Sequence, residues 1–202
     1  MKKLVIKTLI PIICLAFGNA VFADTEEETI VITNVPYSAS ITKKSSTDTV
    51  TMNPVNGVHS GLSTVFTLRT NGGDEHFDYI IKSHINIDGD IVSAYGDDGR
   101  LLFAHVSKPP ALEAVNNAKT GTGISKNVFA YPTIVNTSGG IQSQFKTNYK
   151  DYGNCYAIFM QNAVATDVTH IVQGSPSSNT YEVGIDEAGD YKSTIEFTVV
   201  SK

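Results

Sequence analysis

The stretch Tyr191-Lys192-Ser193-Thr194-Ile195-Glu196-Phe197-Thr198-Val199 decides the fold class, because its side chains alternate in character along the chain. One face carries the larger apolar side chains, at Tyr191, Ile195, Phe197 and Val199. A period of two residues is typical of a strand that buries one face. A turn containing Gly189 precedes the segment. We therefore expect a half-buried β-strand from Tyr191 to Val200.

Similar apolar and β-branched runs recur along the chain, separated by turn residues such as Asn71-Gly72-Gly73 and Asp88-Gly89-Asp90. After residue 23 there are 20 Thr, 17 Val and 15 Ile, more than a quarter of that part, and β-branched residues pack well on a pleated surface. The spacing predicts an all-β fold, a sandwich or a barrel. Besides the last run, the expected strands are Thr29–Val35, Thr49–Met52, Leu62–Arg69, Phe77–Ile87, Asp90–Tyr95, Leu101–Val106, Val128–Val135, Ile141–Phe145, Cys155–Gln161, Val164–Val172 and Thr180–Ile185.

One segment departs from this pattern. Pro109–Val115 combines early prolines with good helix formers, which predicts one or two helical turns. The polar, glycine-containing stretch Asn116–Lys126 is expected to form a loop. No repeat or linker divides the chain, so residues 41–202 are expected to form one β-sandwich domain.

The N-terminus has the layout of a bacterial secretory signal peptide over residues 1–23. Three lysines precede an apolar run, Leu9–Phe17, and small residues end the segment at Ala23. A lipoprotein signal ending at Cys14 is the alternative, but Ile13 stands where a small residue is required. Removal of this segment would leave Cys155 as the only cysteine, so no intramolecular disulfide is expected.

Charge and motifs exclude some classes of function. Fifteen Lys and Arg against twenty Asp and Glu give a net charge of −5, which offers no surface for neutralising nucleic-acid phosphates. Cys155 with His170 as its base would be the candidate nucleophile, but a lone cysteine that begins an apolar strand is more often a buried structural residue. No nucleotide-binding or hydrolase signature occurs. The sequence therefore predicts a protein without catalytic residues or a cofactor.

The acidic turns invite a metal-site interpretation, since converging carboxylates bind calcium. Their spacing does not fit the calcium-binding loop pattern, and Asp-Gly turns need no ion to explain them. His59, His84 and His105 lack the spacing of a zinc site. We expect no bound metal. The acidic candidates are Asp74, Glu75, Asp78, Asp88, Asp90, Asp97 and Asp98, with His76 beside the first group.

A strand-forming segment follows the predicted cleavage site directly. Acidic residues precede it, and it is tethered to the body of the protein on one side only, so it could pair with another sheet. Residues 24–40 are therefore interpreted as an extension that carries a donor strand, with candidate residues Ile30, Val31, Ile32, Thr33 and Val35.

Together these features resemble the subunits of bacterial chaperone-usher fimbriae. Gly189 is the fourteenth residue from Lys202, and the alternating segment after it is similar to the terminal pattern of that family. The single cysteine points to a disulfide-free branch. The resemblance implies an immunoglobulin-like sandwich that is completed by a donor strand, with Gly189, Tyr191, Ile195, Phe197 and Val199 in the terminal assembly strand.

The same resemblance implies a structural subunit of a surface fimbrium that serves adhesion. Its expected partners are other fimbrial subunits, a periplasmic chaperone and an outer-membrane usher. Two other functions remain open from the sequence. One is a secreted, monomeric β-sandwich that binds sugar or protein, and the other is a secreted hydrolase with an unrecognised site.

Overall fold

The computed structural model describes residues 36–47, 62–139, 141–173 and 184–202. Residues 38–202 form one compact unit with an all-β, sandwich-like fold. The predicted signal peptide, the donor segment and the expected strands Thr49–Met52 and Thr180–Ile185 lie outside the described residues.

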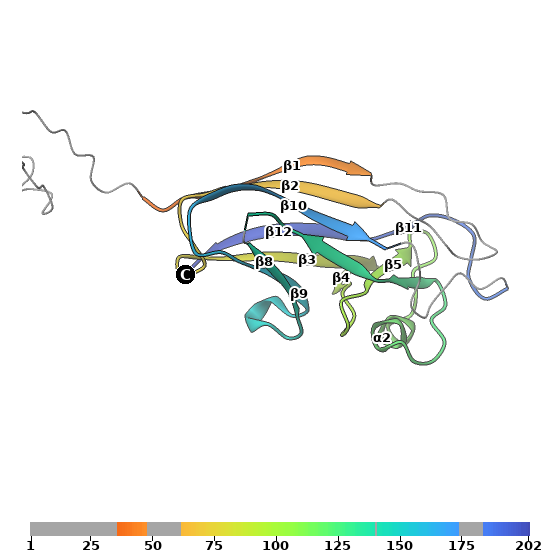
Figure 1. The fold of residues 1–202 in the computed structure, drawn as a ribbon. Helices are drawn as coiled ribbons and strands as arrows, with labels where there is room; N and C mark the ends of the chain where they lie inside the picture. The colour runs from red at the N-terminus through yellow and green to blue at the C-terminus, as the bar shows by residue number, and fades with distance from the viewer. Residues whose placement is uncertain (1–35, 48–61, 140, 174–183) are drawn as a thin grey trace, which may run out of the picture. The chain divides into compact units, whose positions relative to one another are not determined.

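The described residues of this unit form three antiparallel sheets (Figure 1). Sheet A has the order β1-β2-β10-β7, with β1 at Ala39–Thr47, β2 at Ser63–Thr70, β10 at Val164–Val172 and β7 at Thr133–Asn136. Sheet B has the order β12-β3-β9-β8, with β12 at Thr194–Ser201, β3 at Phe77–Ile87, β9 at Cys155–Phe159 and β8 at Gln142–Lys146. The short β4, Asp90–Ser93, also pairs with β3.

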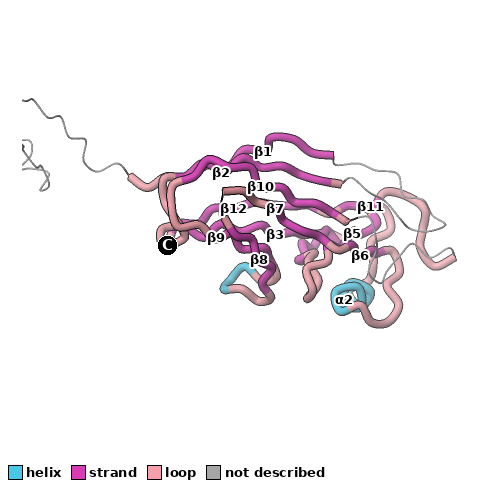
Figure 2. The backbone as a smooth tube through the Cα atoms, viewed as in Figure 1, coloured by secondary structure: helices cyan, strands magenta, loops and turns pink. Residues whose placement is uncertain are grey.

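Sheet C is smaller, with the order β11-β5-β6. Its strands are β11 at Tyr191–Lys192, β5 at Leu101–His105 and β6 at Val128–Tyr131. A helix, α2 at Leu112–Thr120, connects β5 to β6 and packs on both, and a 3-10 turn, η1 at Lys150–Tyr152, precedes β9 (Figure 2).

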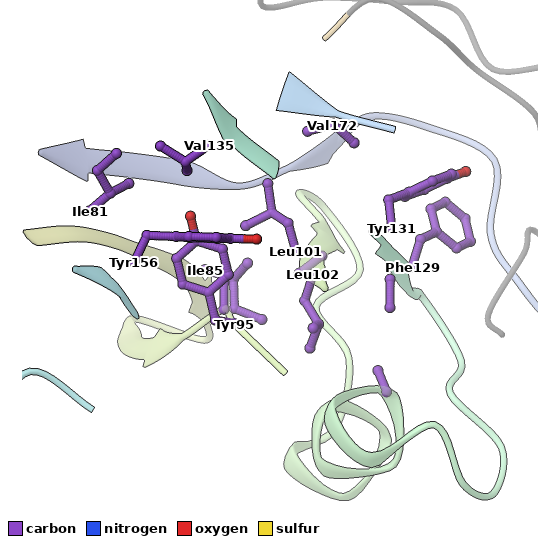
Figure 3. Packing of buried hydrophobic residues seen from close by; sticks show 14 of the residues in the cluster. Ile81, Ile85, Tyr95, Leu101, Leu102, Phe129, Tyr131, Val135, Tyr156 and Val172 are labelled. Carbon is purple, nitrogen blue, oxygen red and sulfur yellow. The ribbon is translucent and has the colours of Figure 1, made fainter. Parts of the chain in front are cut away.

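The core is rich in aromatic and branched side chains. Tyr79, Ile81 and Ile85 of β3 are almost completely buried with Leu68 of β2. Tyr95 lies beside Tyr156 from β9, with ring centroids 5.6 Å apart at an edge-to-face angle (Figure 3). Buried tyrosines need partners for their hydroxyl groups. The hydroxyl of Tyr156 donates to the carbonyl of Thr133 at 2.7 Å.

Two predicted strands divide where the chain moves between sheets. Val128–Val135 was expected as one strand, but β6 belongs to sheet C and β7 to sheet A, with Pro132 between them. Proline has no N–H for a ladder hydrogen bond, so pairing with β5 ends there. The terminal run divides in the same way at Ser193, since β11 pairs with β5 and β12 pairs with β3.

The helix is longer than the sequence predicted. It continues through Asn116–Thr120, which were expected in a loop. The extension is stabilised because Ala118 is buried on the same side as Ala114 and Val115. Gly121 ends the helix in the left-handed conformation, and its N–H donates to the carbonyl of Asn117.

β1 was not predicted from the sequence, because its residues are mostly polar. Only Ala39 and Ile41 alternate toward the core cluster. Among the described residues, no helix is long and apolar enough to cross a membrane.

Candidate functional site

Among the described residues, the order of the strands leaves the outer edge of β12 open. Sheet A has the A-B-E-D order of an immunoglobulin constant-type domain, with β1, β2, β10 and β7 in those places. β12 and β3 then take the places of F and C in the second sheet. Within the described part of the chain, no strand takes the place of G beside β12, which pairs with β3 alone.

The apolar face of β12 is only partly covered. Ile195, Phe197 and Val199 pack against the main core cluster but stay partly exposed, whereas Ile81 of the neighbouring β3 is fully buried. The rings of Phe197 and Phe66 meet edge to face, with centroids 5.5 Å apart.

β1 and β12 approach each other on this side of the sandwich, one from each sheet. Two side chains of β1 are also partly buried against the core. We define the open edge as the five partly covered apolar residues of the two strands: Ala39, Ile41, Ile195, Phe197 and Val199.

Replacing Phe197 with Ala should lower the free energy of unfolding by about 2 kcal/mol. Loss of a fully buried Phe costs roughly 3–5 kcal/mol, and this ring is only partly covered. The matched control is Glu196→Ala on the exposed face, where the 4.0 Å ion pair with Lys82 should contribute less than about 0.5 kcal/mol. Urea unfolding of both variants measures the difference. A larger loss in Glu196→Ala would contradict the inward assignment of Phe197.

The strands β1 and β12 differ in how their outer edges are protected. Exposed edge strands are commonly protected by lysines and bulges. β1 has both, since the register shifts between Lys43 and Ser45, and Lys44 at the bulge forms a 2.6 Å ion pair with Asp167. β12 pairs with β3 in unbroken register, and its only charged residue is Glu196. The edge of β12 is therefore the better template for an added strand.

A close backbone approach fixes the beginning of the terminal segment. Gly189 has φ of +152°, and a Cβ atom there would lie 2.6 Å from Nε2 of His105. Nδ1 of His105 accepts the N–H groups of Ser107 and Lys108, so Nε2 carries the proton and donates to the carbonyl of Ala188 at 3.2 Å. Glycine is needed here because any larger side chain would displace the imidazole.

Tyr191 also fixes the beginning of the terminal segment. Its ring stacks on Phe129 at a centroid distance of 4.1 Å, and its hydroxyl donates to the carbonyl of Glu187. It therefore belongs to sheet C and lies before the open edge, whereas Ile195, Phe197 and Val199 lie within it.

A buried carboxylate holds the other end of β12. Asp78 at the start of β3 accepts hydrogen bonds from Lys150 at 2.5 Å and from the hydroxyl of Tyr152 at 3.2 Å, and Lys202 lies 3.4 Å away. Burial acts to raise the pKa of Asp78, but the lysines outweigh it and lower that pKa. The N–H of Lys202 donates to the carbonyl of His76. The end of β12 is thus attached to the segment around β3.

Cys155 and His170 have separate surroundings. Cys155 is fully buried in a small cluster with Ile80 and Ala157, and burial raises its thiol pKa to about 11. A thiol with that pKa stays protonated at neutral pH, which does not suit a nucleophile. His170 is buried between the sheets, where Nε2 shares a 2.8 Å hydrogen bond with the hydroxyl of Tyr95.

The acidic residues do not converge as metal ligands. In the part of the chain that the structure describes, no group of three or more His, Cys, Asp or Glu side chains could hold an ion. Asp98 forms a two-fold hydrogen bond with Arg100, and Asp78 binds lysines as described above.

The donor-strand candidates Ile30, Val31, Ile32, Thr33 and Val35 lie outside the described residues. Compared with models of known families, with curated proteins and with solved structures, the chain gives no match.

Proposed function

We propose that this chain is an exported structural subunit of a bacterial fimbrium, in which one copy adds a strand to the open edge of the next. The observation that carries this proposal is the unpaired outer edge of β12 in the described residues. An added strand would form backbone hydrogen bonds with the outer edge of β12 and cover its partly exposed apolar side chains. Before assembly the same edge would need protection by a chaperone, and an usher would order the exchange at the outer membrane.

The chain supplies a candidate donor in the alternating segment around Ile32. A strand of this composition, with β-branched residues on both faces, suits a pleated and half-buried surface. The acidic residues before it keep the preceding stretch soluble.

The position of Ser38 favours pairing between copies. The N–H of Asn71 donates to the carbonyl of Ser38, and Phe77, whose N–H donates to the carbonyl of Gly73, pairs with Ser201. Ser38 therefore lies at the end of the sandwich where β12 finishes. Only two residues separate it from Val35, and three peptide units span at most about 10 Å.

This short reach restricts how the donor segment can pair. If it folded back on its own copy it would have to run toward Ser38, parallel to β12. An antiparallel strand, which pairs slightly more stably, requires a second copy. Serial addition of this kind produces a linear polymer.

Uptake of a donor peptide tests the proposal. The exported chain is incubated with a labelled peptide of residues 24–35, or with a scrambled peptide of the same composition, and is analysed by size exclusion and limited proteolysis. We expect the native peptide alone to co-elute with the chain, to increase its resistance to protease and to reduce its self-association. A protease-resistant monomer that takes up neither peptide would contradict the proposal and favour a secreted binding module.

A further inference from the structure

A second feature lies beyond the beginning of β12. An open groove of about 450 Å³ is lined by residues at the start of α2, by the loop before β6 and by Glu187. Its walls include Pro109, Pro110 and Ala111, and its charged rim includes Lys108, Lys126 and Glu187. Apolar walls with a few polar groups are typical of binding sites.

The groove is linked directly to the start of β12. Glu187 on its rim is held by a hydrogen bond from its N–H to the side chain of Asn127. The chain then passes Asp190, whose carbonyl accepts the N–H of Val106, and reaches Ser193 six residues after Glu187. One short segment thus joins the groove to the end of the open edge.

Exposed apolar side chains accompany the groove. The described residues include six exposed large hydrophobics, and three of them, Val106, Leu112 and Ile124, lie close in sequence to its lining. Exposed apolar side chains beside a groove are typical of an interaction surface. Tyr37, in a separate part of the chain, is also exposed, over 58% of its surface.

We propose that Tyr37 of one copy docks in the groove of the next copy in the polymer. This inference rests on the proposed function, because it uses the path of the added strand. β12 has eight residues, and an antiparallel donor of residues 29–35 beside it would point its last residue toward Thr194. Pro36 and Tyr37 then emerge at the end of the sandwich where the groove lies.

The chemistry of the groove suits a tyrosine. The ring packs on the proline and alanine walls, and Lys108 or Lys126 at the rim can lie over its face. The carboxylate of Glu187, which is half exposed in a 3.7 Å ion pair with Lys126, can accept a hydrogen bond from the tyrosine hydroxyl. Docking would also cover part of the exposed apolar surface around α2.

Two peptides test this docking on the exported chain. One contains residues 24–35 and the other residues 24–38, and fluorescence anisotropy measures their dissociation constants at equilibrium. We expect the longer peptide to bind about tenfold more tightly, and Tyr37→Ala within it to remove this gain. Equal affinities of the two peptides would overturn the docking of Tyr37 and leave the proposed function intact. Failure of both peptides to bind would overturn the proposed function and this inference with it.

A variant of the groove gives the reciprocal test. Ala111 is the N-cap of α2 and makes no side-chain capping bond, so Ala111→Asp should preserve folding while it places a carboxylate on the groove wall. We expect it to remove the advantage of the longer peptide without changing the affinity for the shorter one. Ile91→Ala, which alters an exposed apolar residue of β4, is the matched control and should change neither affinity. An unchanged advantage in Ala111→Asp would contradict docking at this groove.

Discussion

Replacing Ile32 with Asp is expected to abolish fibre assembly. In the proposed polymer this side chain enters the partly covered apolar surface of the open edge, formed around Phe197. An unpaired charge placed there costs several kcal/mol, and about 3 kcal/mol already weakens pairing by more than a hundredfold. Sedimentation of polymers formed in the presence of a chaperone, with electron microscopy of the pellet, measures the loss.

Thr33→Asp is the matched control, because it places the same charge on the opposite face of the donor segment. Assembly should persist in this variant with at most a modest reduction. If Thr33→Asp blocked assembly and Ile32→Asp did not, the other face of the segment would be the one that inserts. Normal assembly of both variants would exclude this segment as the donor.

Acidification from pH 7 to pH 4.5 is expected to lower the free energy of unfolding by about 2.5 kcal/mol through His170 alone. Burial lowers its pKa from 6.5 to about 4, since the imidazolium would lose its hydration. The unfolded chain binds this proton near pH 6.5, so the stabilisation is complete above that pH and is lost as the pH falls toward 4. The imidazolium carries an N–H on both ring nitrogens, and the described residues offer no acceptor at Nδ1.

The effect of His170 on stability can be measured separately, because the groups around it do not change charge in this pH range. Tyr95 and Tyr156 contact its ring and have raised pKa values, so both stay neutral throughout this range. Asp78 and Asp98 have lowered pKa values, so the stability they contribute is lost only below their usual value of 3.8. Urea unfolding at intervals from pH 7 to pH 4.5 therefore isolates the histidine. His170→Gln should flatten the profile, whereas His84→Gln should leave it unchanged, and an acid loss that persisted in His170→Gln would refute the assignment.

The strands of the interior could be predicted because local pattern and burial agree there. The expected ranges Phe77–Ile87 and Val164–Val172 are those of β3 and β10. Both combine apolar or alternating residues with clear turns on either side. β1 could not be found in this way, since its polar residues form a strand only by pairing with β2.

The candidate site, too, could be predicted only in part. The alternation of side chains every two residues predicted that Ile195, Phe197 and Val199 share one face, and these side chains do pack against the core. That the other edge of β12 has no partner strand among the described residues could not be predicted from the sequence, because neighbours in a sheet are set by contacts between distant segments. The groove beside α2 was missed because its lining comes from three separate parts of the chain.

The pairing of β3 with β12 also bears on how the chain folds. β3 can form a hairpin with β4 as soon as both have been synthesised, but Phe77 must wait for Ser201, more than a hundred residues later, before its other edge is covered. Such long-range pairing is slow, typically milliseconds to seconds in β-sandwiches. The chain loses the entropy of loop closure before the new contacts stabilise it. Because the chain is synthesised from its N-terminus, β3 presents a bare edge until the last residues arrive. The rate at which β12 reaches it, rather than the final stability, should set how much newly made chain is lost to proteases or aggregation.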